Sequence, residues 1–222
     1  MMTSGSGLKE IRERAVVVGL TGGIGAGKTT ALGMFQELGA ETFSADEFVH
    51  ELYRRPDVKE MLAHKFGDEI FNVDGEIDRK RLLRKAGQFP DGLKWLENLV
   101  SPLITQERIR LMETTPAGSV VVIESPLLIE GGFQRGYDLV VTIEAPFGVR
   151  QKRLSQRFDD KAMQVLEKRR LTTGQRIASA DMHFTNDAGL NELRYFVRMV
   201  YDRALTMAGA KSSTGASEKA SF

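Results

Sequence analysis

The residues best suited to chemistry in this chain form one short stretch, GGIGAGKT, from Gly22 to Thr29. The stretch satisfies the phosphate-loop pattern G-x-x-x-x-G-K-[ST], with Gly27 and Lys28 at its last glycine and its lysine. Glycines let the backbone curl so that successive N–H groups face the phosphates of a nucleotide. Lys28 would reach the β- and γ-phosphate oxygens, and the Thr29 hydroxyl would ligate Mg²⁺. The residues expected to contact the phosphates are Gly22, Gly23, Gly25, Ala26, Gly27, Lys28, Thr29 and Thr30.

Two other nucleotide-binding patterns do not fit this loop. The dinucleotide fingerprint Gly-x-Gly-x-x-Gly, read from Gly23, would require a glycine where the chain has Lys28. Switch GTPases usually carry N-K-x-D and D-x-x-G, and neither string occurs in the sequence. A kinase of small molecules needs less: an acceptor pocket, a base near the acceptor hydroxyl and a basic lid that excludes water.

Three acidic residues are candidates for chemistry near the loop. Asp46 directly follows a segment expected to be a strand, at the sheet edge where open α/β folds bind ligands. Its carboxylate could accept a hydroxyl proton, or it could cap the helix that follows, and position alone favours neither. Glu124 ends another expected strand, where it could orient water on Mg²⁺ or be a structural carboxylate with a buried partner. Glu130 is equally compatible with a surface charge beside a glycine turn.

The densest basic stretch covers residues 150–176, with nine Lys or Arg against three acidic residues. Most charge runs are solvated faces, and that interpretation suits the outer lysines. Arg153 and Arg157 are four residues apart on a helix expected to start near Phe147, so they share a face and could point into one phosphate site. A basic segment at this place could serve as the lid.

The elements that must position these residues follow from apolar patterning. Continuous β-branched runs at residues 15–20, 119–124 and 138–145 predict strands buried on both faces, with weaker strands at 41–43 and 182–185. Residues 57–113 show helical spacing of Leu, Ile and Met. The pattern predicts an α/β fold of the phosphate-loop NTPase type: a parallel sheet flanked by helices, with a helical substrate-binding part and a helical lid.

Composition excludes several classes of protein. The 222 residues include no apolar stretch long enough to cross a bilayer, and the formal net charge of +1 gives no general field for nucleic acid. The absence of cysteine rules out disulfides and thiolate metal sites. The first residues, MMTSGSGLKEIRER, have no hydrophobic signal core, so we expect a cytoplasmic protein.

The motifs together resemble one family, the dephospho-coenzyme A kinases. The resemblance rests on a series of motifs that occur in order between residues 15 and 201: LTGGIGAGKTT (20–30), GAETFSAD (39–46), DRKRL (78–82), PLI (102–104), PLLIE (126–130), KRLSQR (152–157) and ADMHFTN (180–186). It implies transfer of the ATP γ-phosphate to the ribose 3′-hydroxyl of dephospho-coenzyme A, the last step of coenzyme A synthesis, with Mg²⁺ as cofactor and these two small molecules as ligands.

The resemblance also implies roles for individual residues. Asp46 takes the place of the general base, and Lys28 and Arg153 are the other catalytic residues. Arg157 and Asn186 would bind the nucleotide, Arg79 and Leu127 would contact the acceptor, and Thr29 and Glu124 would serve Mg²⁺. The chain departs from the usual family pattern at Ser44, where aspartate is common, at Ser101, where histidine is usual, and at Arg170, where glutamine is common.

These considerations predict the organisation of the chain. We expect a disordered leader (1–14), one kinase domain (15–207) with an acceptor-binding insertion (57–113) and a lid (147–179), and a disordered tail (208–222). Two other functions stay open at this stage: a kinase acting on other nucleotides or nucleosides, and an ATP-binding regulator without catalysis. The sequence does not predict an oligomeric state.

Overall fold

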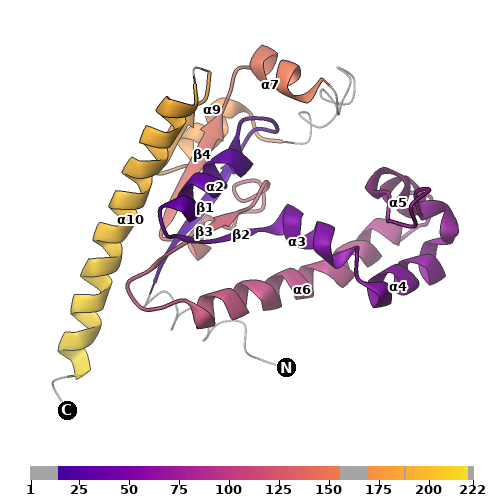
Figure 1. The fold of residues 1–222 in the computed structure, drawn as a ribbon, viewed down its shortest axis with the longest axis horizontal. Helices are drawn as coiled ribbons and strands as arrows, with labels where there is room; N and C mark the ends of the chain where they lie inside the picture. The colour runs from indigo at the N-terminus through magenta and orange to yellow at the C-terminus, as the bar shows by residue number, and fades with distance from the viewer. Residues whose placement is uncertain (1–14, 156–169, 188, 220–222) are drawn as a thin grey trace. The chain divides into compact units, whose positions relative to one another are not determined.

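The structure is a computed structural model that describes residues 15–155, 170–187 and 189–219 (Figure 1). The expected leader, residues 1–14, lies outside the described residues. The chain divides into two compact units, which we call the sheet unit (Met1–Phe43 with Leu111–Phe222) and the helical unit (Ser44–Arg110). The helical part therefore starts at Ser44, well before the expected start of the insertion at residue 57, because the helices from residue 45 onward share its core.

Within the described ranges the sheet has five strands, and the five segments expected to be strands are confirmed. The strands follow the order β2-β3-β1-β4-β5, and β1 pairs in parallel with β3 and β4, as β4 does with β5. Their bounds are β1 Val16–Gly22, β2 Glu41–Ser44, β3 Val120–Glu124, β4 Leu139–Glu144 and β5 Met182–Thr185. Three neighbouring strands, β1, β3 and β4, are buried along their whole length, as expected of a parallel sheet with both faces covered.

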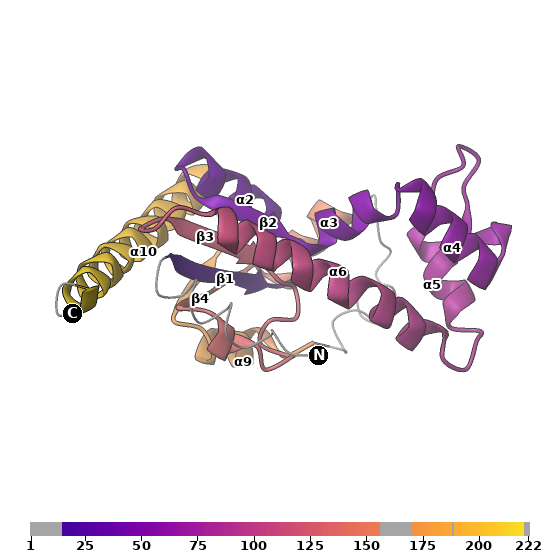
Figure 2. The same cartoon turned by 90° about the horizontal axis from the view of Figure 1, so that it is seen from below.

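Two helices cover one face of this sheet. Strand residues that alternate along β1 and β4, such as Val18 and Val141, pack in one core with Phe35 of α2 (Lys28–Glu37) and Val197 of α10 (Leu190–Lys219). Figure 2 shows α2 and the upper part of α10 above β1. Burial of apolar side chains between these layers contributes most of the stability of such a unit.

The opposite face is covered by shorter segments. A side chain at Gly19 would collide with Leu128 and Tyr137, since an ideal Cβ there lies 2.5 Å from Leu128 Cδ1. Helix α9 (Thr173–Ala178) lies on this side of β4, below the sheet in Figure 2. The remaining short elements are α7 (Phe147–Leu154) and the 3-10 turn η2 (Gln134–Gly136).

Helix α10 runs past residue 207, where we expected the folded domain to end. Ala208 is fully buried in the core, and Lys211 Nζ lies 2.9 Å from Asp138 Oδ2 and donates to the Ala15 carbonyl at 3.2 Å. The low hydrophobicity of the last residues suggested a disordered tail. Burial of Ala208 and the ion pair of Lys211 extend the helix beyond that boundary.

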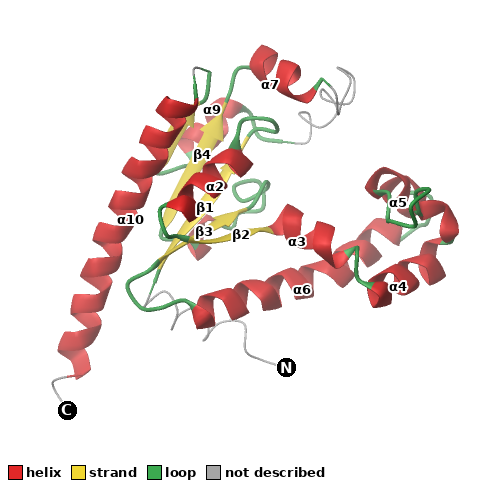
Figure 3. Cartoon of the chain, in the orientation of Figure 1, coloured by secondary structure: helices red, strands yellow, loops and turns green. Residues whose placement is uncertain are grey.

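The helical unit has its own core. Its helices are α3 (Ala45–Leu52), α4 (Pro56–Phe66), α5 (Arg79–Ala86) and α6 (Gly92–Thr114), with a 3-10 turn η1 at Asp68–Ile70 and one isolated bridge between Phe71 and Ile77 (Figure 3). Phe66 makes edge-to-face contacts with Phe89 and Trp95, at centroid distances of 5.6 and 5.5 Å. The helical periodicity expected for residues 57–113 is confirmed by α4, α5 and α6. Across the part of the chain that the structure describes, we find no helix with the length and apolar character needed to cross a membrane.

Candidate active site

The phosphate loop joins β1 to α2, and its glycines are required by the backbone. Gly22, Gly25 and Gly27 have φ values of 135°, 72° and 107°, which residues other than glycine rarely adopt. A Cβ at Gly22 would lie 1.9 Å from the Ile143 carbonyl oxygen, and one at Gly27 would lie 2.5 Å from Asn186 Nδ2. The sequence pattern thus matches a loop that wraps closely over its neighbours.

Lys28 lies under this loop, at the first residue of α2. Its Nζ donates to the carbonyl oxygens of Gly22 and Gly23 at 3.2 and 3.1 Å, and it lies 3.9 Å from Glu124 Oε1. Both side chains are buried, and Glu124 is the last residue of β3, which neighbours β1. Glu124 therefore has the buried partner that the structural alternative required, but that partner is itself the lysine of the phosphate loop.

The oxygen donors of this region fit Mg²⁺. Thr29 is exposed at the start of α2 and offers a hydroxyl, while Glu124 offers a carboxylate, and both are hard ligands of the kind that Mg²⁺ prefers. Among the residues described, no group of three or more His, Cys, Asp or Glu could hold a metal by itself. An ion bound here would complete its coordination with phosphate oxygens and water.

Two further expected residues lie against the same loop. Arg153, on α7, donates from Nη1 to the carbonyls of Gly25 and Ala26, both at 3.4 Å, and from Nη2 to the Asn186 carbonyl at 3.2 Å. Asn186 is buried just after β5, and its Nδ2 donates to the Ala26 carbonyl at 2.8 Å. A pocket of about 210 Å³ adjoins them, lined by Gly27, Thr30, Arg153, Asn186, Gly189, Leu190 and Leu193. Arg157 lies outside the described residues.

Two arginines that were not among the expected site residues also contact the loop. Arg150 is 3% exposed, and its guanidinium donates to the Ala145 carbonyl at 2.9 Å and to the Ile24 carbonyl at 3.4 Å. Arg170 Nη1 donates to the Gly22 carbonyl at 3.2 Å. Both belong to the basic stretch noted in the sequence, but their spacing alone did not separate them from its solvated lysines.

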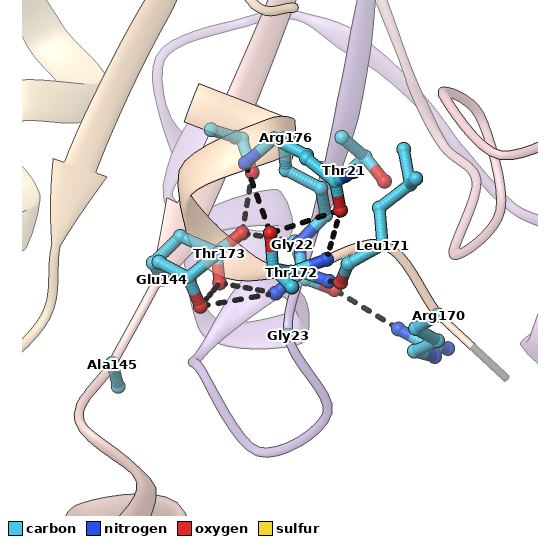
Figure 4. Close-up of polar contacts among 12 residues, drawn as sticks. Thr21, Gly22, Gly23, Glu144, Ala145, Arg170, Leu171, Thr172, Thr173 and Arg176 are labelled. Carbon is cyan, nitrogen blue, oxygen red and sulfur yellow. Dashed lines mark hydrogen bonds and ion pairs between the residues drawn. The ribbon is translucent and has the colours of Figure 1, made fainter. Parts of the chain in front are cut away.

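A buried ion pair lies next to the loop (Figure 4). Arg176 donates from Nε and Nη2 to the two carboxylate oxygens of Glu144, both at 2.6 Å, and neither residue is more than 1% exposed. Burial by itself would raise the pKa of Glu144, but hydrogen bonds from Arg176, Thr142 and Thr173 outweigh it and leave the pKa below its ordinary value. Glu144 is therefore ionised at neutral pH.

Glu130 belongs to the same network and is not a surface charge. Its side chain is 12% exposed, its Oε1 accepts from the Leu171 N–H at 3.3 Å, and that oxygen lies 3.9 Å from Arg176 Nη1. Its Oε2 is buried and has no hydrogen-bond partner within the described ranges. The surface interpretation of Glu130 is wrong because its carboxylate is largely buried next to the Leu171 N–H and the Arg176 guanidinium.

Asp46 belongs to the helical unit, and the structure excludes one of its two possible roles, that of helix cap. Ser44 is the N-cap of α3, and its hydroxyl accepts from the Glu47 N–H at 3.4 Å, so the cap interpretation of Asp46 is wrong. The side chain of Asp46 is 64% exposed and pairs with Arg79, with 3.6 Å between Oδ1 and Nη2. An exposed carboxylate that does not cap its helix is available to a ligand.

The DRKRL motif explains where Arg79 lies. Asp78 is the N-cap of α5 and accepts from the N–H groups of Lys80 and Arg81 at 2.9 and 3.1 Å, which makes Arg79 the first residue of the helix. These backbone hydrogen bonds, that from Arg81 foremost, lower the pKa of Asp78. Burial raises the pKa of nearby Tyr53, and the cation of Arg79 opposes that effect. A small pocket of about 70 Å³ here is lined by His50, Tyr53, Arg54, Glu76, Ile77 and Arg79.

Comparison with known proteins identifies the family. A family model described as dephospho-CoA kinase matches residues 16–192. The chain belongs to the dephospho-CoA kinase family. The dephospho-CoA kinase of Methylococcus capsulatus is 35% identical over 199 residues, which cover 88% of this chain and all of that protein (100%). The dephospho-CoA kinase of Frankia casuarinae is 35% identical over 201 residues, covering 88% of this chain and 86% of that protein.

Solved structures support the fold of this kinase family member. TT1252 from Thermus thermophilus superposes with a TM-score of 0.71 at 24% identity, covering 86% of this chain and 98% of that one. The dephospho-CoA kinase of Campylobacter jejuni superposes with a TM-score of 0.56 at 21% identity, covering 85% and 96%.

The geometry brings together the donor-side residues expected of a dephospho-CoA kinase. Lys28, Glu124, Arg153 and Asn186 all lie at the phosphate loop. Leu127 is 49% exposed in the turn after β3, and its expected contact with the acceptor stays a prediction.

Proposed function

We propose that this protein transfers the γ-phosphoryl group of ATP to the ribose 3′-hydroxyl of dephospho-CoA, giving CoA and ADP. The observation that carries the proposal is the convergence of Lys28, Arg153 and Asn186 on one phosphate loop in a chain of the dephospho-CoA kinase family. The loop motif is typical of sites that bind the phosphates of a nucleoside triphosphate, and membership of the family indicates dephospho-CoA as the acceptor. We expect the reaction to take place in the cytoplasm.

The residues of the donor side would hold the triphosphate in line for transfer. The loop N–H groups and Lys28 would bind the β- and γ-phosphate oxygens, and Arg153 would bind charge that develops on the transferring group. Mg²⁺, held by Thr29 and through Glu124, would supply further neutralisation of phosphate charge when it is bound. In the transfer, the acceptor 3′-oxygen forms a bond to the γ-phosphorus while the bond to the β–γ bridging oxygen breaks, and ADP leaves.

Asp46 would take the proton that the acceptor hydroxyl loses. Asp46 is exposed and does not cap α3. It pairs with Arg79, which would either hold the carboxylate in place or move to contact the acceptor. We expect Arg79 and Leu127 to contact the rest of dephospho-CoA. The segment 147–179, of which 156–169 lie outside the described residues, would close over the phosphates as a lid.

The experiment is an ADP-release assay with dephospho-CoA and with nucleosides as alternative acceptors. Asp46→Asn should lower kcat by roughly 100-fold or more, the usual contribution of a general base, while ATP binding changes little. Asp57→Asn is a matched control, because Asp57 is also an exposed carboxylate of the helical unit paired with an arginine. Its turnover should equal that of the wild type.

Three results would contradict parts of the proposal. Turnover with nucleosides but not with dephospho-CoA would point to a different kinase. ATP binding without any acceptor-dependent ADP release would indicate a regulator without catalysis. Wild-type turnover by Asp46→Asn would remove Asp46 from the role of base and leave the substrate assignment intact.

A further inference from the structure

Arg170 shares a hydrogen-bond acceptor with the lysine of the phosphate loop. The Gly22 carbonyl accepts from Arg170 Nη1 and from Lys28 Nζ, each at 3.2 Å (Figure 4 shows the arginine contact). The two nitrogen atoms are therefore no farther apart than twice that distance. Since Lys28 is the cation that phosphate loops direct at the β- and γ-phosphates, a second cation lies beside the same phosphates.

We propose that Arg170 is a further catalytic residue, which binds the β- and γ-phosphate oxygens of ATP together with Lys28. This inference rests on the proposed function. A guanidinium stays charged at all relevant pH values and matches phosphate oxygens in a fork. Arg170 forms no covalent bond in the transfer. Its guanidinium stabilises the charge on the oxygens of the phosphoryl group while that group moves from ADP to the acceptor.

The shared carbonyl explains how ATP would recruit Arg170. A neutral carbonyl oxygen accepts two donors, here a guanidinium and an ammonium. Phosphate oxygens are negatively charged, so bonds from a guanidinium and an ammonium to them add an attraction between opposite charges that a neutral carbonyl does not offer. Both side chains therefore gain by exchanging the Gly22 carbonyl for the triphosphate.

The backbone that follows Arg170 is held on both sides. The Leu171 N–H donates to Glu130 Oε1 at 3.3 Å, and the Leu171 carbonyl accepts from Arg176 Nη1. Thr172 then caps α9 in a reciprocal capping box with Gln175. Because the two residues after Arg170 have fixed partners, its side chain starts from a defined place.

Arg176, which binds the Leu171 carbonyl, is itself held at the end of the sheet where the phosphate loop begins. Arg176 is held by Glu144, the last residue of β4, and the residue before it, Ile143, is in register with Gly22 of β1. A Cβ at Gly23 would lie only 3.3 Å from Glu144 Oε2. The segment that carries Arg170 is thus fastened next to the loop that it contacts.

Arg150 makes a useful contrast. It donates to Ile24, further along the loop, and is 3% exposed, so its guanidinium is enclosed by protein. Arg170 is partly exposed and contacts the first residue of the loop. Arg150 is suited to support the loop, and Arg170 is suited to contact a ligand.

The test compares Arg170→Gln and Arg170→Lys in the full chain. Arg170→Gln should lower kcat by roughly 10- to 100-fold, less than the loss of a principal transition-state donor. It should raise the Kd of ATP by roughly tenfold while the Kd of AMP, which lacks both phosphates, changes less than about twofold. Arg170→Lys should recover part of both losses. Arg198→Gln, an exposed arginine of α10 paired with Asp202, is the control and should behave as the wild type.

The role of Glu130 in placing Arg170 is tested through the same ratio of ATP to AMP affinity. Glu130→Ala removes the acceptor of the Leu171 N–H and should lower the ratio, whereas Glu130→Gln keeps an acceptor oxygen and should restore it. In the Arg170→Gln background, Glu130→Ala should not lower the ratio further. A further decrease would show that Glu130 does not act through Arg170.

Two results would overturn the assignment of Arg170. One is wild-type kcat in Arg170→Gln; the other is an equal rise in the Kd of ATP and AMP, which would indicate a general disturbance of the site. If the wild type shows no turnover with dephospho-CoA, the proposed function fails, but the ratio of ATP to AMP affinity still decides whether Arg170 binds the phosphates.

Discussion

Removing the charge of Glu144 should destabilise the sheet unit strongly. Glu144→Gln keeps the shape of the side chain but removes the carboxylate 2.6 Å from Arg176, which is 0% exposed, and the carboxylate of Glu130 lies farther from that guanidinium, at 3.9 Å. The amide nitrogen of glutamine would also face donors, since each carboxylate oxygen accepts from Arg176 and from a threonine. Breaking a buried ion pair from one side costs about 3–5 kcal/mol of unfolding free energy. For a protein of this size that corresponds to a decrease in melting temperature of roughly 10 °C.

The assay is urea denaturation followed by circular dichroism, with an exposed ion pair as control. Arg194 and Glu37 have the same N–O distance, 2.6 Å, but their side chains are 58% and 61% exposed. Glu37→Gln should therefore cost less than about 1 kcal/mol. Because the chemical change and the distance are matched, the difference between the two variants measures the effect of burial.

Two further measurements test the same reasoning. Arg176→Met in the Glu144→Gln background should restore part of the lost stability, because the buried charge that Glu144 neutralises is then gone. The pKa of Glu144 is lowered in the folded protein, so the stability that its carboxylate contributes is fully present above the ordinary pKa of 4.5 and is lost as the pH falls through the lowered folded value. The difference in unfolding free energy between the wild type and Glu144→Gln should therefore decrease as the pH falls below 4.5. Equal losses in Glu144→Gln and Glu37→Gln would refute the argument.

Two other variants test the fold around the site. Gly22→Ala places a Cβ 1.9 Å from the Ile143 carbonyl at a φ of 135°, so it should cost more than about 2 kcal/mol of stability and weaken ATP binding, as measured by denaturation and calorimetric titration. Lys211→Met removes the partner of Asp138 and should cost about 1 kcal/mol, since the Asp138 carboxylate still accepts from the Val17 N–H; an unchanged melting temperature would show that α10 does not need this ion pair.

Local features of the sequence were sufficient to predict the strands and the phosphate loop. The strands are runs of β-branched residues whose burial on both faces leaves few alternatives to a parallel sheet. The loop is a contiguous pattern in which Gly22, Gly25 and Gly27 adopt backbone angles that favour glycine. Position alone left the role of Asp46 open, because a cap and a base can have the same residue type at the same place in a sequence, and only the family resemblance implied a base.

Only the tertiary structure decided which charged residues work together. Arg170 and Gly22 are 148 positions apart in the sequence, and Arg176 and Glu144 are 32 apart, yet each pair is in contact. The same structure placed Ser44 rather than Asp46 at the cap of α3 and extended α10 beyond residue 207. The sequence by itself determined the ligand class, because phosphate recognition here depends on neighbouring backbone groups. It could not determine burial or the choice of ionic partner, because these depend on side chains that only folding brings together.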